Sequence, residues 1–471
     1  MKKSLIIIAA ASLVLNGCAG NDTFKEIKQQ ENSAIGFSTY TSRQTRAENS
    51  SETHYDALEA YNNTFRLWGN KYINKGELDT NNQPILTASP VFGFTGEGTS
   101  ASPYEYPGEK VEFKTTPVST LIGNWDYTPI RFWDKTATHY DFYAASPFIP
   151  KSTTASGTEE KVWNFDNDTK KISLPNFTVS GINRVTTGTG NENAAFGVLT
   201  TIDNAAVMSY EQEDLMIATD IPAYKDYGYA TYTTGVNLQF NHILSRLNIA
   251  IRKKSPELDD YTIKLNSFKI YNMFKNGAFN EADANSTSTP ALAEGTIARW
   301  TGRTEKFAPG TMIYEPSEAL DITSTSAATD GSYQYIYEGL VIPQNVGFSK
   351  TVLVNEENKP EGYFLIDGSN AVSSGDGEWS NPYVVIDYEI GTGTGNNYKK
   401  VDRYVYYFNL AEIFGATTSA GIDFCEGWQN TVKITLAPVA IKFDAEVAKW
   451  DEKFAENSTE NPKTGTTFEL Q

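Results

Sequence analysis

Apolar and polar side chains alternate with a period of two residues along most of this chain. Successive side chains of a β-strand point to opposite faces of a sheet, so this period predicts strands that are buried on one face. Helix-like spacing is confined to short pieces such as residues 409–414. The pattern therefore predicts an all-β protein. Its clearest instances are Phe65 and Leu67, Tyr140, Phe142 and Ala144, Val236, Leu238 and Phe240, and Leu247, Ile249 and Ile251.

Turn residues between neighbouring runs predict β-hairpins. Asp, Asn, Gly and Pro favour the backbone conformations of tight turns, and Asn-Gly is typical of a two-residue type I′ turn. Three places combine such residues with flanking alternation: Asp166-Asn167-Asp168 between residues 163–165 and 172–174, Asn276-Gly277 after residues 268–270, and Pro438 between residues 432–436 and 441–447.

The length of 471 residues allows two domains that each bury a core. The alternation restarts at residue 236. We therefore expect two β-sandwich domains joined near residue 235, rather than an α/β fold or a single barrel.

The overall charge limits the possible partners. The chain has 39 Lys+Arg and 58 Asp+Glu, for a net charge of −19. Nucleic acids and anionic membrane surfaces attract basic proteins, so neither is an expected partner.

The N-terminus has the organisation of an export signal. Lys2 and Lys3 precede an apolar stretch over residues 5–15, which is too short to span a bilayer. Leu15-Asn16-Gly17-Cys18 follows and is similar to the lipobox of bacterial lipoproteins. This similarity implies that Cys18 becomes the first mature residue and carries acyl chains, which together anchor a protein stably. Ordinary secretion with an incidental cysteine is the alternative.

One strand is expected between this signal and the first domain. Ile35, Phe37 and Thr39 share one face of a predicted strand over residues 34–40. A polar stretch over residues 41–51 follows, and such exposed segments are preferred sites of proteolysis.

Few residues are suited to catalysis or to metal binding. His54, His139 and His242 are scattered, without the spacing of a metal site or a catalytic triad, and His242 is expected to be buried. The glycines of residues 391–395 lack the Lys and the helix of a phosphate-binding loop. Cys425 is the only cysteine that follows Cys18, so no intramolecular disulfide is expected in the mature chain. We expect neither an enzyme nor a cofactor or metal site.

Several motifs follow one another along the chain. They are the lipobox at Cys18, Thr45-Arg46-Ala47, Trp133 with residues 140–147, residues 240–247, and residues 441–443 through Trp450. No single motif is specific, but their order and spacing together resemble the fimbrillin family of Bacteroidales, the type V pilins. Residues 424–428, Phe-Cys-Glu-Gly-Trp, are similar to the family's Phe-x-Pro-Gly-x segment with the Pro replaced.

The resemblance implies a fold and a mode of assembly. The fold would be two tandem transthyretin-like Greek-key β-sandwich domains. The precursor would be lipidated at Cys18 and reach the outer membrane. An Arg-directed protease would then cut between Arg46 and Ala47, with Arg43 as the second candidate. Fimbrial subunits would polymerise by strand insertion into a cell-surface fimbrium, as stalk, tip or accessory subunits that support adhesion to a host or bacterial surface ligand.

Together these expectations divide the chain into five parts. Losing residues 18–46 would remove the predicted strand and leave an open sheet edge that another subunit's strand could fill. The C-terminal tail is a possible donor strand, although its few apolar residues are equally consistent with a disordered end. The five parts are a signal peptide (1–17), a propeptide (18–46), an N-terminal domain (47–235), a C-terminal domain (236–451) and a tail (452–471).

A different class of function is also open. A monomeric lipoprotein could bind surface glycans by stacking sugars on aromatic side chains. Trp125, Trp133, Trp300 and Trp379 lie near predicted loops and are the candidates. The alternating pattern instead favours a core position for most aromatic residues.

Overall fold

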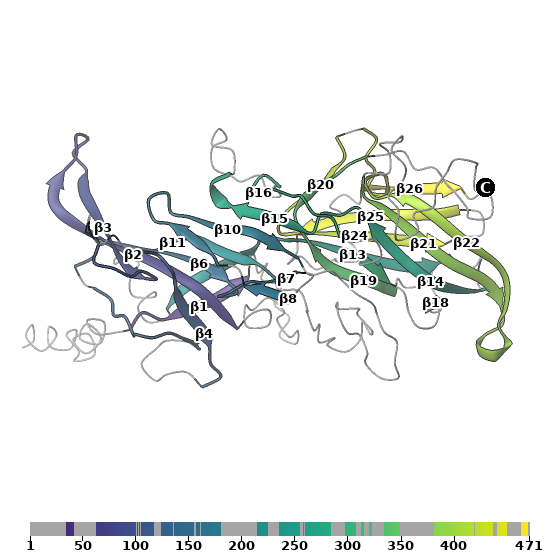
Figure 1. Cartoon of the computed structure of the whole chain (residues 1–471), viewed down its shortest axis with the longest axis horizontal. Coiled ribbons are helices and arrows are strands. Elements are labelled where there is room, and N and C mark those ends of the chain that lie inside the picture. Colours follow the sequence, from purple (N-terminus) through teal and green to yellow (C-terminus); the bar gives the residue numbers. More distant parts are fainter. Residues whose placement is uncertain are drawn as a thin grey trace, which may run out of the picture. The chain divides into compact units, whose positions relative to one another are not determined.

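The computed structural model describes most of the predicted strands. It covers residues 34–41, 63–99, 101, 103, 105–116, 124–134, 136–154, 157–160, 162–179, 214–224, 235–254, 258, 260–283, 297–307, 312–314, 320–322, 334–348, 381–418, 420–436, 440–449 and 463–469. The regular elements in these residues are nearly all strands (Figure 1). Their helical elements are α5 (Leu410–Ile413) and the short 3-10 turns Glu281–Asp283 and Gly395–Asn397. The prediction of an all-β fold is confirmed.

Contacts divide the chain into two units, each of which is described by itself. Unit 1 contains residues 1–41, 57–148 and 217–240, and unit 2 contains residues 42–56, 149–216 and 241–471. The units thus alternate along the chain, whereas the sequence suggested one boundary near residue 235. The limits of the predicted domains at residues 46, 235 and 451 stay predictions.

Unit 1 is built around one eight-stranded sheet. Its strand order is β1-β12-β11-β6-β2-β4-β5, and β3 pairs with β2. β2 and β3 form a long hairpin that extends beyond the other strands (Figure 1). The strands are β1 (Phe37–Thr41), β2 (Thr64–Leu78), β3 (Pro84–Phe92), β4 (Glu109–Phe113), β5 (Trp125–Asp126), β6 (His139–Ser146), β11 (Met216–Tyr224) and β12 (Val236–His242).

Unit 2 contains two five-stranded sheets. β13 is buried along nearly its whole length, and every second or third residue of β14 faces the core, as expected for strands inside a β-sandwich, so the sandwich prediction is confirmed. One sheet has β19 (Gln334–Val341), β13 (Ser245–Lys253), β24 (Trp428–Leu436), β25 (Ala440–Lys449) and β26 (Lys463–Glu469). The other has β17 (Met312–Tyr314), β14 (Thr262–Tyr271), β21 (Tyr383–Thr392) and β22 (Lys399–Asn409), with β18 (Leu320–Ile322) beside β14.

Smaller sheets complete unit 2. A four-stranded sheet has the order β16 (Trp300–Thr301), β15 (Asn276–Asn280), β10 (Lys171–Thr178) and β9 (Asn164–Asp166). Two pairs join β7 (Lys151–Thr154) to β8 (Gly157–Glu160), and β20 (Gln344–Val346) to β23 (Ile422–Phe424).

Two of the three predicted hairpins are confirmed. β9 and β10 are antiparallel, and Oδ1 of Asp166 accepts the N–H of Asp168 across their turn at 2.8 Å. β24 and β25 are also antiparallel. The prediction of a turn at Asn276-Gly277 is wrong, because these two residues begin β15. The Asn276 side chain accepts the N–H groups of Thr304 and Glu305, which holds the chain extended there.

Candidate functional site

Residues 34–41 complete the sheet of unit 1. β1 runs parallel to β12, in a register that places Phe37 opposite Val236 and Thr41 opposite Phe240. The N–H of Val236 donates to the carbonyl of Gly36 at 2.8 Å. β1 is therefore bonded along one edge to a strand that lies about 200 residues later in the chain.

The other edge of this segment meets the chain that follows β5. The N–H of Ile35 donates to the carbonyl of Arg131 at 2.9 Å, and Ala34 forms an antiparallel bridge with Phe132. The Tyr127 hydroxyl donates to the carbonyl of Ile35 at 2.6 Å. Residues 34–41 thus lie between the two ends of the sheet and join them. We call the space that these residues fill the β1 groove.

Apolar side chains of the segment fill an aromatic pocket at the bottom of the β1 groove. Ile35 and Phe37 are both 0% exposed. The Phe37 ring makes edge contacts with Phe92, Tyr127 and Phe142, at centroid distances of 5.7, 5.8 and 5.6 Å. Such burial removes from water nearly all the apolar surface that these two side chains offer.

A polar contact follows two residues further along the segment. The indole Nε1 of Trp125 donates to the Thr39 hydroxyl at 3.1 Å. Phe65 and Phe113 hold the Trp125 ring by edge contacts at 4.9 and 5.3 Å. Because Trp125 is 3% exposed, Thr39 satisfies a donor that has little access to water.

Burial also fixes the protonation of Tyr127. Desolvation raises the pKa of its phenol well above the usual value, so the hydroxyl keeps its proton at neutral pH. It can therefore donate to the Ile35 carbonyl there.

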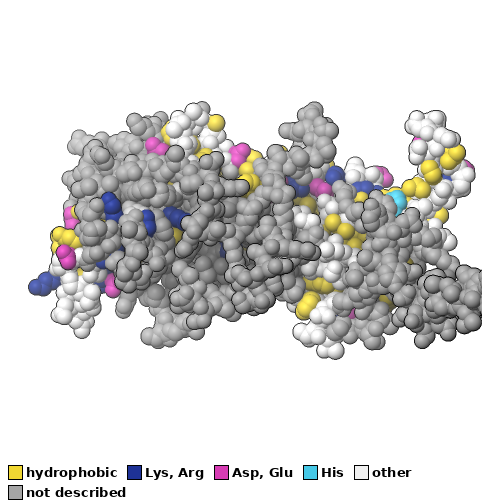
Figure 2. All heavy atoms as spheres, turned by 180° about the vertical axis from the view of Figure 1, so that it is seen from behind, with side chains coloured by type: hydrophobic (Ala, Val, Ile, Leu, Met, Phe, Trp, Pro, Cys, Tyr) yellow, Lys and Arg dark blue, Asp and Glu magenta, His cyan; other side chains and the backbone are white. Residues whose placement is uncertain are grey.

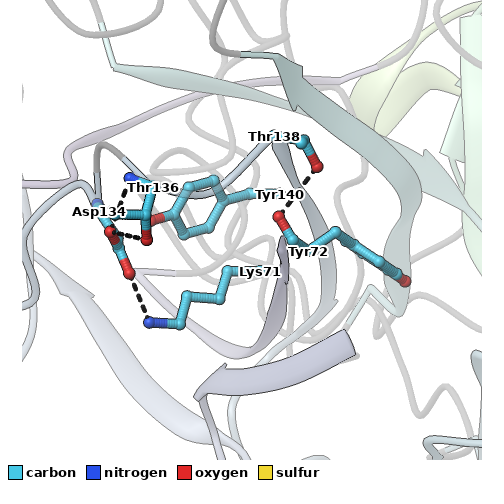
Figure 3. Close-up of polar contacts among 6 residues, drawn as sticks. All are labelled: Lys71, Tyr72, Asp134, Thr136, Thr138 and Tyr140. Carbon is cyan, nitrogen blue, oxygen red and sulfur yellow. Dashed lines mark hydrogen bonds and ion pairs between the residues drawn. The ribbon is translucent and has the colours of Figure 1, made fainter. Parts of the chain in front are cut away.

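The loop after Phe132 is tied to the sheet by side-chain contacts (Figure 3). Asp134 accepts from Lys71 Nζ at 2.7 Å and from the N–H and hydroxyl of Thr136. The N–H of Asp134 donates to the Tyr140 hydroxyl at 2.7 Å, and Thr138 donates its hydroxyl to the Tyr72 carbonyl. These contacts join the loop to β2 and β6, so they support the wall of the β1 groove that holds Ile35.

Acid is expected to loosen this wall. The hydrogen bond from Lys71, followed by that from Thr136, lowers the pKa of Asp134 to about 2. Because the pKa is depressed in the folded protein, ionised Asp134 stabilises the loop at pH values above the ordinary pKa of about 3.9. This stabilisation is lost as the pH falls towards 2. We expect Asp134→Asn to speed amide exchange of Ile35 two- to fivefold at pH 6, because loss of a partly exposed ion pair costs about 0.5–1 kcal/mol. At pH 2.5 the increase in exchange should be much smaller.

Hydrogen exchange followed by mass spectrometry, corrected for the intrinsic rate, measures this effect. Asp79→Asn, on the tip of the β2–β3 hairpin, is the control and should leave Ile35 unchanged. An Asp134→Asn effect of equal size at both pH values would contradict the prediction.

Gly235 permits the close approach of β12 and the segment. Its φ is +82°, and a Cβ there would lie 2.9 Å from the Gly36 carbonyl oxygen and 3.2 Å from the Phe37 nitrogen. These are backbone atoms that cannot move aside without displacing β1. Only glycine therefore fits this position while the segment is in place.

We expect Gly235→Ala to open the segment locally and to raise amide exchange over residues 37–41 at least about fivefold, since such strain costs about 1–3 kcal/mol. Gly393→Ala is the matched control, because Gly393 has a φ of +78° and a Cβ there would also be obstructed, by the Asn397 carbonyl of unit 2. Unchanged exchange over residues 37–41 in Gly235→Ala would refute the prediction.

The structure locates only part of the predicted processing region. The strand expected over residues 34–40 is confirmed as β1 with its flanking residues. Cys18, Arg43, Arg46 and Ala47 lie outside the described residues, so lipidation and cleavage stay predictions. Sequence reasoning did not identify Trp125, Tyr127 and Gly235 as residues that hold the segment.

Three of the four aromatic residues proposed for sugar stacking are core residues. Trp125, Trp133 and Trp300 are 3%, 6% and 1% exposed, and Trp379 lies outside the described residues. Phe132 in unit 1 and Val401 in unit 2 are large apolar side chains that are exposed. On the face drawn in Figure 2, the hydrophobic side chains form small groups among polar ones. Three of the four candidates are thus unable to stack on a sugar in this conformation.

The described residues contain no cluster of three or more His, Cys, Asp or Glu side chains suited to a metal ion. His242 is buried as expected, and its Nδ1 lies 2.6 Å from Asp214 Oδ2. Cys425 is half-buried between β23 and β24, and its Sγ lies 3.7 Å from the Asp423 carbonyl oxygen. No helix in the described part is long and apolar enough to cross a membrane.

The C-terminal tail also carries a strand. β26 pairs with β25 in antiparallel register, with Phe468 opposite Ile441. It is the last strand of its sheet. Residues 452–462 and 470–471 of the predicted tail lie outside the described residues.

A family model described as fimbrillin-like matches residues 81–376, more than half of the chain. The chain belongs to the fimbrillin-like family. This family is one of fimbrial and adhesion proteins at the cell surface, so the fimbrillin-like chain is not an enzyme. The resemblance inferred from the order of motifs is confirmed.

Solved structures of low sequence identity are similar to this fimbrillin-like chain. A fimbrial protein from Bacteroides vulgatus is 14% identical, with a TM-score of 0.41, and the match covers 89% of this chain and 100% of that one. A proposed cell adhesion protein from Bacteroides uniformis is 13% identical, with a TM-score of 0.31, and the match covers 88% and 98%. No curated protein sequence matches the chain.

Proposed function

We propose that this protein is a structural subunit of type V fimbriae that assembles by donor-strand exchange. The complete burial of Ile35 and Phe37 between β12 and residues 131–132 carries the proposal. The precursor is exported as an outer-membrane lipoprotein through Cys18. Cleavage after Arg46, or after Arg43, separates the segment from the domain that it completes.

Loss of the segment has a large physical cost for the isolated subunit. It leaves unpaired backbone groups on β12 and at Arg131, and it exposes the aromatic pocket to water. A strand from another fimbrial subunit restores both the hydrogen bonds and the burial. The fimbrium built in this way supports adhesion, and the C-terminal tail with β26 is a candidate donor.

The alternation within the C-terminal strands supports a donor of this kind. β25 reads Ile441-Lys442-Phe443, with the same spacing of an aliphatic and an aromatic residue as Ile35-Gly36-Phe37. In the sequence of the tail, Phe468 and Leu470 have the same spacing in the opposite order. Either segment could place an aromatic ring in the pocket of Phe37.

Controlled cleavage tests assembly. The chain from residue 19 onwards is treated with a limiting amount of an arginine-specific protease. We expect a new N-terminus at Ala47 or Gln44 by mass spectrometry, together with a ladder of oligomers on gels of unboiled samples. The double variant Arg43→Gln/Arg46→Gln is the matched control and should stay monomeric. A stable core that starts elsewhere, or that stays monomeric after cleavage at Arg46, would overturn the proposal.

Lipidation is tested separately. In cells that express the full chain, labelled palmitate should be incorporated into the wild-type protein and not into Cys18→Ser. Incorporation into both would place the acyl chains elsewhere.

A further inference from the structure

The β1 groove makes contacts with three alternate side chains of the strand inside it. Ile35 and Phe37 are enclosed in the apolar pocket, and Thr39 accepts from Trp125. The backbone contacts to Val236, Arg131 and Tyr127 are independent of sequence, because they use only the N–H and C=O groups of the segment. Sequence selectivity therefore depends on the three side chains.

The contact at Thr39 is the polar member of this set. The edge contacts with Phe65 and Phe113 hold the indole in one orientation, so its N–H cannot turn towards water. A strand with an apolar residue at this position would leave a buried donor without a partner, which is costly. The β1 groove thus requires a hydroxyl at the position of Thr39, in addition to apolar side chains that fit the aromatic pocket.

The chain's own C-terminal segments do not combine these three features. Residues 441–445 place Ala445 where Thr39 lies, and residues 466–470 place Leu470 there. Phe454 is followed at that spacing by Glu456, but Glu452 then falls at the position of Ile35.

We propose that the β1 groove selects a donor strand that reads aliphatic-x-Phe-x-Thr or Ser in the direction of β1, and so prefers a strand of a different subunit to the C-terminal segments of a second copy of this chain. The inference rests on the proposed strand exchange and adds the chemistry of the partner. Trp125 is the residue that determines this specificity. A subunit with this preference ends or joins runs of other subunits, and it does not form a homopolymer efficiently.

Peptide binding to the full chain, cut after Arg46, tests the preference. The native peptide spans residues 33–43, and its Thr39→Val form removes the hydroxyl at nearly constant shape while keeping a good strand former. A second pair spans residues 439–447, with Ala445 or with Ala445→Thr. Fluorescence anisotropy of labelled peptides gives the dissociation constants.

We expect the valine form to bind about tenfold more weakly than the native peptide, and Ala445→Thr to bind about tenfold more tightly than its parent. Trp125→Phe keeps an aromatic ring and removes the indole N–H, so both differences should vanish in that variant. Ser38→Ala in the native peptide is the control for a change on the solvent side of the strand.

The outcomes separate the two proposals. Equal binding of the Thr and Val forms to the wild-type groove, or the same difference in Trp125→Phe, would overturn the selectivity and leave strand exchange intact. Failure of the native peptide to bind under any condition would overturn strand exchange and the selectivity with it.

Discussion

Replacing Phe37 by Ala is expected to release residues 34–41 from unit 1 without unfolding unit 2. The ring is completely buried against three other aromatic rings, and truncation of such a side chain costs about 3–5 kcal/mol. The segment depends on few other side chains. We therefore expect the lost free energy to weaken the binding of the segment in the β1 groove, and not to destabilise the cores of the other sheets.

After cleavage at Arg46, the variant should lose its N-terminal segment at least 100 times faster than the wild type, and oligomers should form correspondingly earlier. Native mass spectrometry follows both species in one sample. Ser38→Ala is the control, because Ser38 is half-buried and its hydroxyl makes a long hydrogen bond to Asn237, at 3.4 Å. A release rate within threefold of the wild type would mean that the aromatic pocket does not retain the segment.

The alternation of apolar residues was sufficient to predict most strands. Phe65, Leu67 and Phe142 are fully buried on one face, as the period of two required. The pairing of β24 with β25 also followed from pattern, because a short connection around Pro438 allows only antiparallel neighbours. Local patterns are reliable where pairing is local.

Pairing between distant segments was not predictable from the sequence. β1 lies beside β12, and β10 lies beside β15, although each pair is separated by roughly 100 residues or more. Asn276-Gly277 illustrates the difference, since a Cβ at Gly277 would lie 3.1 Å from the Trp300 ring. That glycine serves packing within the sheet and not a turn.

In the candidate site, too, local features were predictable from the sequence and contacts between distant segments were not. The two apolar residues of β1 were evident from spacing, and they are the residues that the pocket encloses. Trp125 and Gly235 were not evident, because their roles depend on the tertiary approach of a strand from the other end of the sheet. His242 was expected to be buried, but nothing local pointed to Asp214 as its neighbour.

A disulfide between β1 and β12 should prevent assembly completely and reversibly. Ser38 and Asn237 are partners in the parallel register, and neighbouring strands lie about 4.8 Å apart, within the Cα separation of about 4.4–6.8 Å that disulfides accept. The variant Ser38→Cys/Asn237→Cys, made in a chain that starts at residue 19 with Cys425→Ser, has no other thiol. Each single cysteine variant is a control for the substitution itself.

Cleavage after Arg46 should proceed normally in the oxidised double variant, because the bond lies beyond the cross-link. The cut segment cannot leave, so the β1 groove stays filled and the protein stays monomeric on gels and in light scattering. A reducing agent should then start oligomerisation in the same sample. Assembly of the oxidised, cleaved protein would show that donors attach elsewhere, since a cross-linked β1 leaves no open edge on β12 for another strand to occupy.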